Sequence, residues 1–206
     1  MGLMGAGYRG DLAVGEQAYH RFYPGLGISL QFLSEKLISP QLNTGFGKFV
    51  AQDRDLPAVE GVQPNTFVST PFFFVDFRLK ARFLRARRCV PYLSAGIGML
   101  GYTPKDVNGN NLLDNVSTRE EGEIYGSITA GFPLSVGLEL RMNRLMALGL
   151  EYTFRPTGSD YLDNVGLLGY KEGKDKLHSL MLSLYFTIDP TGTMREFNPV
   201  RGRDRK

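Results

Sequence analysis

The sequence is poor in the residues from which disulfides and metal sites are built. Its 206 residues include one cysteine, Cys89, two histidines, His20 and His178, and no tryptophan. A single cysteine excludes an internal disulfide and a cysteine-based metal cluster. Two histidines argue against a histidine-rich metal site. We therefore expect neither a metal nor a cofactor.

Long hydrophobic runs are absent as well. No segment approaches the roughly 18 consecutive apolar residues of a membrane-spanning helix, which excludes a helical membrane protein. A membrane β-barrel is not excluded, because its apolar residues alternate with polar ones and average out along the sequence. The formal net charge of +3 is too small to indicate nucleic-acid binding. The first residues lack the charged region and the cleavage site of a signal peptide, so if the protein is exported we expect this sequence to be its mature form.

Alternation of apolar residues with small or polar ones dominates the sequence. From Ile128 to Met142 every even position is apolar, whereas the odd positions hold glycine, proline, hydroxyl or charged residues. A period of two residues predicts a β-strand. The same pattern predicts eight strands and no helix of any length, with the strands at residues 3–12, 22–33, 37–50, 66–83, 90–104, 125–142, 145–156 and 177–188.

The connections between these strands alternate in length. Short ones cover residues 34–36, 84–89 and 143–144; long ones, rich in Gly, Asp, Asn and Pro, cover residues 13–21, 51–65, 105–124 and 157–176. In an up-and-down barrel, successive connections lie at opposite ends, so one end carries the short turns and the other the long loops. Outer-membrane barrels have this asymmetry, with short turns in the periplasm. We predict an all-β fold, an eight-stranded antiparallel transmembrane barrel over residues 1–188, followed by a periplasmic tail over residues 189–206.

The volume of the side chains decides which face of the wall points outward. About 40 large apolar residues would overfill the interior of an eight-stranded barrel, which is only just wide enough for side chains. The opposite face is mostly Gly, Ser, Thr and Ala, which fits a narrow lumen. We therefore place the apolar face in the lipid; the alternative is a soluble barrel or sandwich with the apolar face inside.

The lumen face carries scattered charges that must pair with each other or with water. One interpretation is a structural plug of ion pairs and water, and the other is a proton or ion path; the bore is too narrow for a porin. Gln31, Gln41, Asn43 and Arg82 belong to the same face. The predicted lumen charge network consists of Arg9, Asp11, Asp76, Arg78, Lys80, Glu139, Arg141, Glu151 and Arg155.

Three motifs near the long loops resemble one family. The first predicted strand ends Tyr-Arg-Gly-Asp-Leu at residues 8–12, the fifth contains Pro-Tyr-Leu-Ser-Ala-Gly-Ile-Gly at residues 91–98 and ends Gly-Tyr-Thr-Pro-Lys at residues 101–105, and the seventh leads into Asp-Tyr-Leu-Asp at residues 160–163. In this order and spacing they resemble the PorG-type outer-membrane barrels of the Bacteroidota, components of the type IX secretion and gliding machinery. The resemblance covers about residues 3–188. The absence of tryptophan and the tail depart from common outer-membrane barrels.

The resemblance implies an eight-stranded, non-enzymatic barrel in the outer membrane. It also implies partners: its periplasmic side would contact the ring built from the PorK lipoprotein and PorN, and its wall would contact outer-membrane lipid. No catalytic residue carries over, because the family motif is not a catalytic one. No nucleic acid and no small-molecule substrate are expected.

Two basic segments are expected at the short-turn end. Arg82, Arg85, Arg87 and Arg88 lie in or beside a short turn, and the tail, which emerges at the same end, holds a further basic group. Such a turn is either a solvated segment near lipid headgroups or a docking point for an acidic periplasmic partner, since guanidinium groups suit carboxylates. The predicted partner-binding residues are Arg85, Arg87, Arg88, Phe197, Arg201, Arg203 and Arg205.

Two other candidates are weaker. The segment from Asp106 resembles the start of a calcium loop, but Asn111 stands where glycine is needed and Ser117 where glutamate is needed, so we expect a flexible loop. His178 is predicted to face the lipid while Ser179 faces the lumen, which provides no catalytic triad. Three functions follow: a structural anchor for a periplasmic assembly, a stand-alone barrel whose long loops bind an extracellular ligand, and a lipid-modifying enzyme, of which we favour the first.

Overall fold

The computed structural model describes residues 1–12, 22–32, 36–52, 66–83, 88–113, 126–143, 146–165 and 174–186. None of the helices in this part of the chain is both long and apolar enough to cross a membrane. The strands are β1 (Gly2–Arg9), β2 (Tyr23–Gln31), β3 (Ile38–Gln52), β4 (Phe67–Arg82), β5 (Cys89–Tyr102), β6 (Ile128–Gly131), β7 (Leu134–Arg141), β8 (Met146–Pro156) and β9 (Lys176–Phe186).

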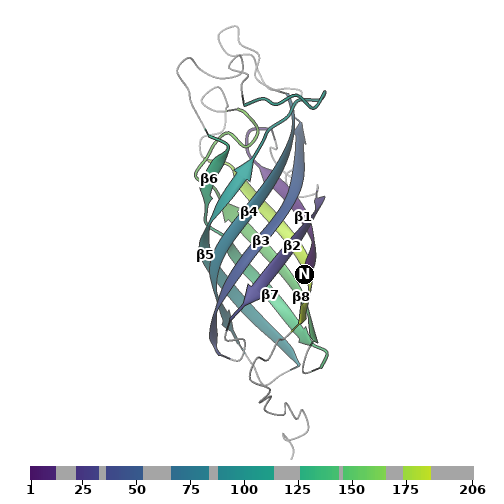
Figure 1. Cartoon of the computed structure of the whole chain (residues 1–206), viewed down its shortest axis with the longest axis vertical. Helices are drawn as coiled ribbons and strands as arrows, with labels where there is room; N and C mark the ends of the chain where they lie inside the picture. Colours follow the sequence, from purple (N-terminus) through teal and green to yellow (C-terminus); the bar gives the residue numbers. More distant parts are fainter. Residues whose placement is uncertain are drawn as a thin grey trace, which may run out of the picture.

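All strands pair antiparallel, and the sheet closes on itself (Figure 1). The strand order runs from β4 through β3, β2, β1, β9, β8 and β7 to β5, and β5 in turn pairs with β4. Strands β6 and β7 together form one interrupted strand of the barrel, because both pair with β5 in a continuous register, with Gly98 opposite Gly131 and Ala95 opposite Leu134. Between them Pro133 has no N–H to donate to the ladder. Because β6 and β7 together occupy one strand position, the barrel has eight strand positions around its wall, which confirms the predicted eight-stranded up-and-down barrel.

The observed strands differ from the predicted ones by up to three residues at their ends. We call the end of the barrel at which β1 finishes the long-loop end. The opposite end, at which β9 finishes, is the short-turn end. The predicted tail, residues 189–206, lies outside the described residues.

The apolar face of the wall points outward, as predicted. Leu3 is 68% exposed and Ile97 is 65% exposed, while Lys80 on the opposite face is fully buried. A wall of this polarity is stable only where its outer surface contacts lipid, because each large apolar side chain left in water forfeits roughly 1.5–3 kcal/mol. The alternative of a soluble barrel or sandwich with an apolar interior is therefore wrong.

The interior is filled by large side chains that stand opposite glycines. Phe72 and Phe74 interrupt the polar alternation of β4 in the sequence; they are buried inside the barrel opposite Gly47 and Gly45 of β3. A Cβ atom on Gly45 would lie 2.8 Å from the Phe74 ring. Several of the abundant glycines thus provide room in the lumen for the large side chains of the adjacent strand.

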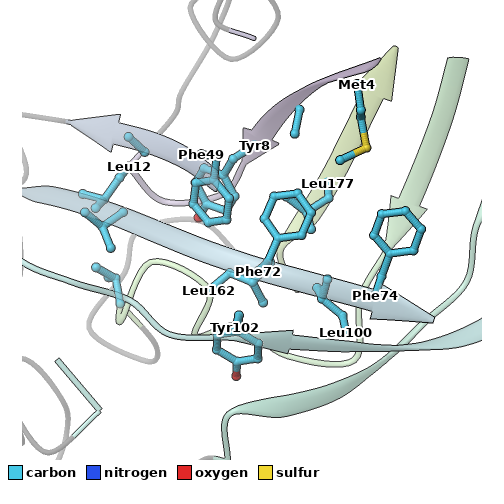
Figure 2. Packing of buried hydrophobic residues seen from close by; sticks show 14 of the residues in the cluster. Met4, Tyr8, Leu12, Phe49, Phe72, Phe74, Leu100, Tyr102, Leu162 and Leu177 are labelled. Atoms are coloured by element: carbon cyan, nitrogen blue, oxygen red, sulfur yellow. The ribbon is translucent and has the colours of Figure 1, made fainter. Parts of the chain in front are cut away.

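The half of the lumen near the long loops is apolar (Figure 2). The rings of Tyr8 and Phe49 stack with their centroids 4.4 Å apart and an interplanar angle of 9°, and Phe72 packs beside Phe49 with centroids 6.4 Å apart. Leu162 and Val165, from the connection between β8 and β9, are fully buried in the same cluster. The long-loop end of the bore is therefore closed by packed side chains.

The Gly137→Val substitution should destabilise the barrel. Gly137 stands opposite Tyr92, and an added Cβ would lie 2.3 Å from the tyrosine Cζ atom. Overpacking of this kind costs about 1–3 kcal/mol. The free energy of unfolding in detergent micelles, followed by circular dichroism in urea, measures the loss. Gly126→Val is the matched control, because an added Cβ there has no neighbour closer than 3.9 Å; equal stability of the two variants would contradict the role of glycine as space for lumen side chains.

Candidate functional site

The middle of the lumen holds a buried ion network centred on Arg78. Arg78 contacts the Asp76 Oδ2 atom at 2.5 Å and the Glu151 Oε1 atom at 2.9 Å. Arg155 reaches the same Asp76 oxygen at 2.5 Å, and the Tyr92 hydroxyl donates to Glu151 Oε2 at 2.9 Å. These side chains come from β4, β5 and β8, so the network joins walls on different sides of the bore.

A second ion network lies nearer the short-turn end. Lys80 pairs with Glu139, which also accepts from the Arg82 Nε atom at 3.0 Å. Arg82 donates in addition to the Ser39 hydroxyl at 2.7 Å. The Lys80 ammonium group lies 3.6 Å from the centre of the Tyr92 ring, where the ring quadrupole attracts a cation. Every charge in this network has an opposite charge beside it, as burial requires.

Most of the predicted lumen residues lie in these two networks, namely Asp76, Arg78, Lys80, Glu139, Glu151 and Arg155. Gln41 and Asn43 are also buried inside. Arg141 is half-buried at the short-turn end of β7. Asp76 Oδ1 and Ser94 Oγ are buried and have no hydrogen-bond partner among the described protein atoms; atoms of this kind are usually satisfied by internal water.

Two predicted lumen residues lie elsewhere. Arg9 is exposed on the outer face, because the residues of β1 that face inward are Met4, Ala6 and Tyr8. The outward positions of β1 hold Leu3, Gly5 and Gly7, which differ little in polarity from the inward ones, so the alternation did not indicate the face of Arg9. Asp11 is buried, but it follows β1 and lies near Asp163 at the long-loop end.

A third polar group, which the sequence analysis missed, closes the mouth of the barrel at the long-loop end. The Tyr8 hydroxyl lies 2.6 Å from Asp163 Oδ2 and 2.7 Å from Asp175 Oδ1, and both aspartates are fully buried. We call Tyr8, Asp163 and Asp175 the mouth cluster. Asp163 belongs to the Asp-Tyr-Leu-Asp motif, but nothing in the spacing indicated that it meets Tyr8, which is 155 residues away.

The mouth cluster fixes a segment that crosses the lumen. Residues 157–165 follow β8 and turn back at Asn164, whose φ of 62° is left-handed. The Leu162 carbonyl accepts from Thr70 of β4 at 2.7 Å, and Ser159 bonds the Tyr102 hydroxyl of β5 at 2.7 Å. The segment is thus hydrogen-bonded to β1, β4 and β5, and it covers the lumen as a lid.

The geometry of the mouth cluster requires a shared proton. A tyrosine hydroxyl has one hydrogen, so only one of its two carboxyl contacts can use it; the other contact needs a protonated carboxyl. Asp163 accepts backbone N–H groups on both oxygens, from Leu12 at 3.2 Å and Val165 at 2.9 Å. Asp175 accepts one, from Leu162 at 2.8 Å. The better-supported charge is on Asp163, and the proton is assigned to Asp175.

Burial and mutual repulsion support this assignment. Burial is the main cause that raises the pKa of Asp163, to about 7, and the nearby Asp11 adds to it. Burial likewise raises the pKa of Asp175, and the charges of Asp163 and Asp160 raise it further. Each of the two aspartates thus has other carboxyl groups beside it, and their negative charge favours retention of the proton.

His178 faces outward, as predicted, yet it is buried. Its cross-strand neighbours are Gly7 and Phe154, and the Phe22 ring covers it at a centroid distance of 5.4 Å. Neither neighbour offers a nucleophile or a carboxylate. In the described part of the chain no group of three or more His, Cys, Asp or Glu side chains could hold a metal.

The calcium-like segment is structured by its own hydrogen bonds. Asp106 Oδ1 accepts the backbone N–H groups of Asn108 and Asn110, both at 2.8 Å, and the backbone of Lys105 bridges Ser69 and Asn111. The expected flexible loop is therefore a short hairpin between residues 103 and 113. Hydrogen bonding from Asn110 and its neighbours lowers the pKa of Asp106, and its oxygens are occupied by loop donors.

Of the predicted partner-binding residues, the structure describes Arg88. It is exposed at the short-turn end, where its carbonyl accepts from the Arg141 N–H at 2.9 Å and its Nε donates to the Arg141 carbonyl at 3.4 Å. The single cysteine, Cys89, follows it and is exposed. The other predicted partner-binding residues, Arg85, Arg87, Phe197, Arg201, Arg203 and Arg205, lie outside the described residues.

Comparison with known proteins supports the fold. No protein-family model and no curated protein matches the sequence. Neisserial surface protein A is 10% identical with a TM-score of 0.53, over 91% of this chain and 94% of that one. The Ail attachment invasion locus protein of Yersinia pestis is 9% identical with a TM-score of 0.49, over 90% and 93%. The outer-membrane enzyme PagL is 15% identical with a TM-score of 0.41, over 90% and 98%. The chain is an eight-stranded barrel of the outer-membrane type.

Removing the carboxylate of Glu139 should destabilise the barrel. The Glu139→Gln variant leaves Lys80 and Arg82 buried without an opposite charge, and breaking a buried pair costs about 3–5 kcal/mol. The free energy of unfolding in micelles measures the loss. The double variant Lys80→Met/Glu139→Gln should lose less than the sum of the single variants, because the two side chains are coupled; strict additivity would argue against the pairing.

The mouth cluster predicts a pH dependence. Because burial raises the pKa of Asp163 from 3.8 to about 7 and also raises the pKa of Asp175, the native lid binds more protons than the unfolded chain. Its stability is therefore lost as the pH rises through the raised pKa values of this pair. Proteolytic cleavage within residues 157–175, measured between pH 5 and pH 9, should therefore increase with pH. Asp175→Asn keeps an amide beside Tyr8 and should flatten this dependence. Asp106→Asn should leave it unchanged, because the pKa of Asp106 is lowered; a profile unaltered by Asp175→Asn would contradict the shared proton.

Proposed function

We propose that this protein is a non-enzymatic component of a type IX secretion and gliding machinery, which anchors a periplasmic lipoprotein ring of the PorK/PorN type to the outer membrane. In this proposal the chain is the mature form after signal-peptide removal, and residues 189–206 extend into the periplasm. The observation that carries it is the filled lumen. Ion networks occupy its middle and lower half and aromatic side chains its upper half, so a function that needs a solute path is disfavoured and the two ends remain for contact with partners.

The short-turn end supports the anchoring role. Arg88 is exposed there, and it forms two hydrogen bonds with the Arg141 backbone, one through its own carbonyl and one through its Nε atom. Arg85 and Arg87 precede it in the sequence, and the tail adds Arg201, Arg203 and Arg205 with Phe197 as an apolar anchor. Guanidinium groups bind carboxylates in a bidentate manner, so the expected partner surface is acidic.

The surroundings of His178 support the non-enzymatic part of the proposal. A hydrolase would need a nucleophile and a carboxylate beside this histidine, whereas its flanking residues on β1 and β8 are Gly7 and Phe154. These two cross-strand neighbours supply neither group.

A second candidate function is binding of an extracellular partner through the long loops. The observation that favours it is the hairpin of residues 103–113, which extends beyond β5 and carries Val107 with 75% of its surface exposed. The hairpin can therefore present an apolar contact to a partner outside the membrane. Deleting residues 106–110 should then abolish surface binding while leaving the periplasmic complex intact.

The unique cysteine allows a direct test of the anchor. Cys89 is exposed beside Arg88, so a maleimide crosslinker attached there reaches any protein docked on the short-turn end. We expect crosslinking in isolated outer membranes to capture a ring lipoprotein, identified by mass spectrometry, and Cys89→Ser to abolish the product. Recovery of the inserted barrel alone would overturn the anchoring role and favour the second candidate.

Reversing the basic charges should weaken the complex. The Arg85→Glu/Arg87→Glu/Arg88→Glu variant places like charges against an acidic partner, and we expect at least a tenfold loss of co-purified ring subunits at unchanged barrel insertion. Lys36→Glu is the control, because Lys36 is exposed at the same end but in another turn. Normal recovery of the ring with the triple variant would show that this turn is not the docking point.

A further inference from the structure

The charged residues of the strands are sorted by sign as well as by face. The acidic residues of the described strands are Asp76, Glu139 and Glu151, and all are buried in the lumen. The charged residues on the outward face of these strands are all cations, and all lie at the long-loop end: Arg9 on β1, Lys48 on β3 and Lys176 on β9. We call these residues the outer cation group.

Two members of this group stand directly opposite each other. Arg9 and Lys176 are cross-strand partners in the β1–β9 pair, which places their Cβ atoms roughly 4.5–5.5 Å apart. Like charges in this position repel and destabilise a sheet. An exposed lysine, Lys174, adds positive charge two residues before β9. Positive charge concentrated in this way on the outer face of the seam favours binding of an anion.

The position of the group along the wall indicates the source of the anion. One step below Arg9 and Lys176, Gly7 stands opposite His178, and the Phe22 ring covers the histidine. Below this aromatic layer the outward residues of β9 are Leu180 and Leu182, 43% and 48% exposed. On β3, Lys48 likewise follows the exposed Phe46. The cations therefore lie at the upper border of the apolar band, where the headgroups of lipids lie.

We propose that the outer cation group binds the phosphate groups of anionic lipids in the leaflet on the long-loop side. The Arg9 guanidinium can hold two phosphate oxygens at once, and Lys48 and Lys176 act as point charges. The acyl chains of the same lipid would cover the apolar wall below, around Leu180. This second contact distinguishes a lipid headgroup from free phosphate, and the inference does not depend on the proposed periplasmic ring.

Lipid retention by the intact chain tests the site. The protein is reconstituted into phosphatidylcholine vesicles with or without diphosphorylated lipid A, extracted in mild detergent and weighed by native mass spectrometry. We expect the wild type to retain lipid A, and the Arg9→Gln/Lys48→Gln/Lys176→Gln variant to bind it roughly fivefold more weakly for each cation removed. The control Lys36→Gln removes an exposed cation at the short-turn end and should retain lipid A as the wild type does.

Phosphate competition and a single charge-reversal variant test the site further. Inorganic phosphate, added to the extracted complex, should not release the lipid; complete release would identify a free-phosphate site and overturn the proposal. Lys176→Glu alone should weaken retention more than Lys176→Gln, and it provides a test if the triple variant fails to insert. Equal retention by the wild type and by Lys176→Glu would overturn the proposal as well.

Discussion

The narrow bore of an eight-stranded wall is the constraint on which the other features of this protein depend. The lumen is only just wide enough for side chains, so a large residue on one strand requires a small one on the facing position of the next. The pairs of Phe74 with Gly45, Phe72 with Gly47 and Tyr92 with Gly137 satisfy this requirement. The same constraint places the bulky apolar residues on the outside, and it thereby decides that the barrel belongs in lipid.

The filling of the bore is divided by chemistry along its length. Charged side chains in the middle and near the short turns pair across the lumen, which lets distant walls be joined through Asp76 and Glu139. Near the long loops, aromatic side chains and the segment of residues 157–165 take their place. A buried charge network is weak evidence for stability, because desolvation offsets much of the attraction. Its strong effect is on register, since a strand displaced by one residue would turn its charges into the lipid.

The sequence was sufficient for the walls of the barrel but not for its mouth. Residues 128–142 alternate without a break, and their strand was predicted correctly apart from the interruption at Pro133. In β1 the outward positions hold Gly5 and Gly7, so the pattern has little contrast, and Arg9 was assigned to the wrong face. The contact of Tyr8 with Asp175 joins residues 167 positions apart. Periodicity cannot reveal such a contact, because it describes one strand at a time, whereas the contact depends on how the loops return over the lumen.

The seam between β1 and β9 has a consequence for the order of assembly. Strand β1 pairs with β9 along the whole length of β1, and the Met1 amino group donates to the Leu184 carbonyl at 3.0 Å. The final ladder therefore cannot form before β9 is present, and a chain that ends before β9 exposes two unpaired edges. Unpaired backbone groups cannot be tolerated in hydrocarbon, so insertion and closure must be coupled. The unpaired strands must therefore be kept from aggregating until β9 pairs with β1.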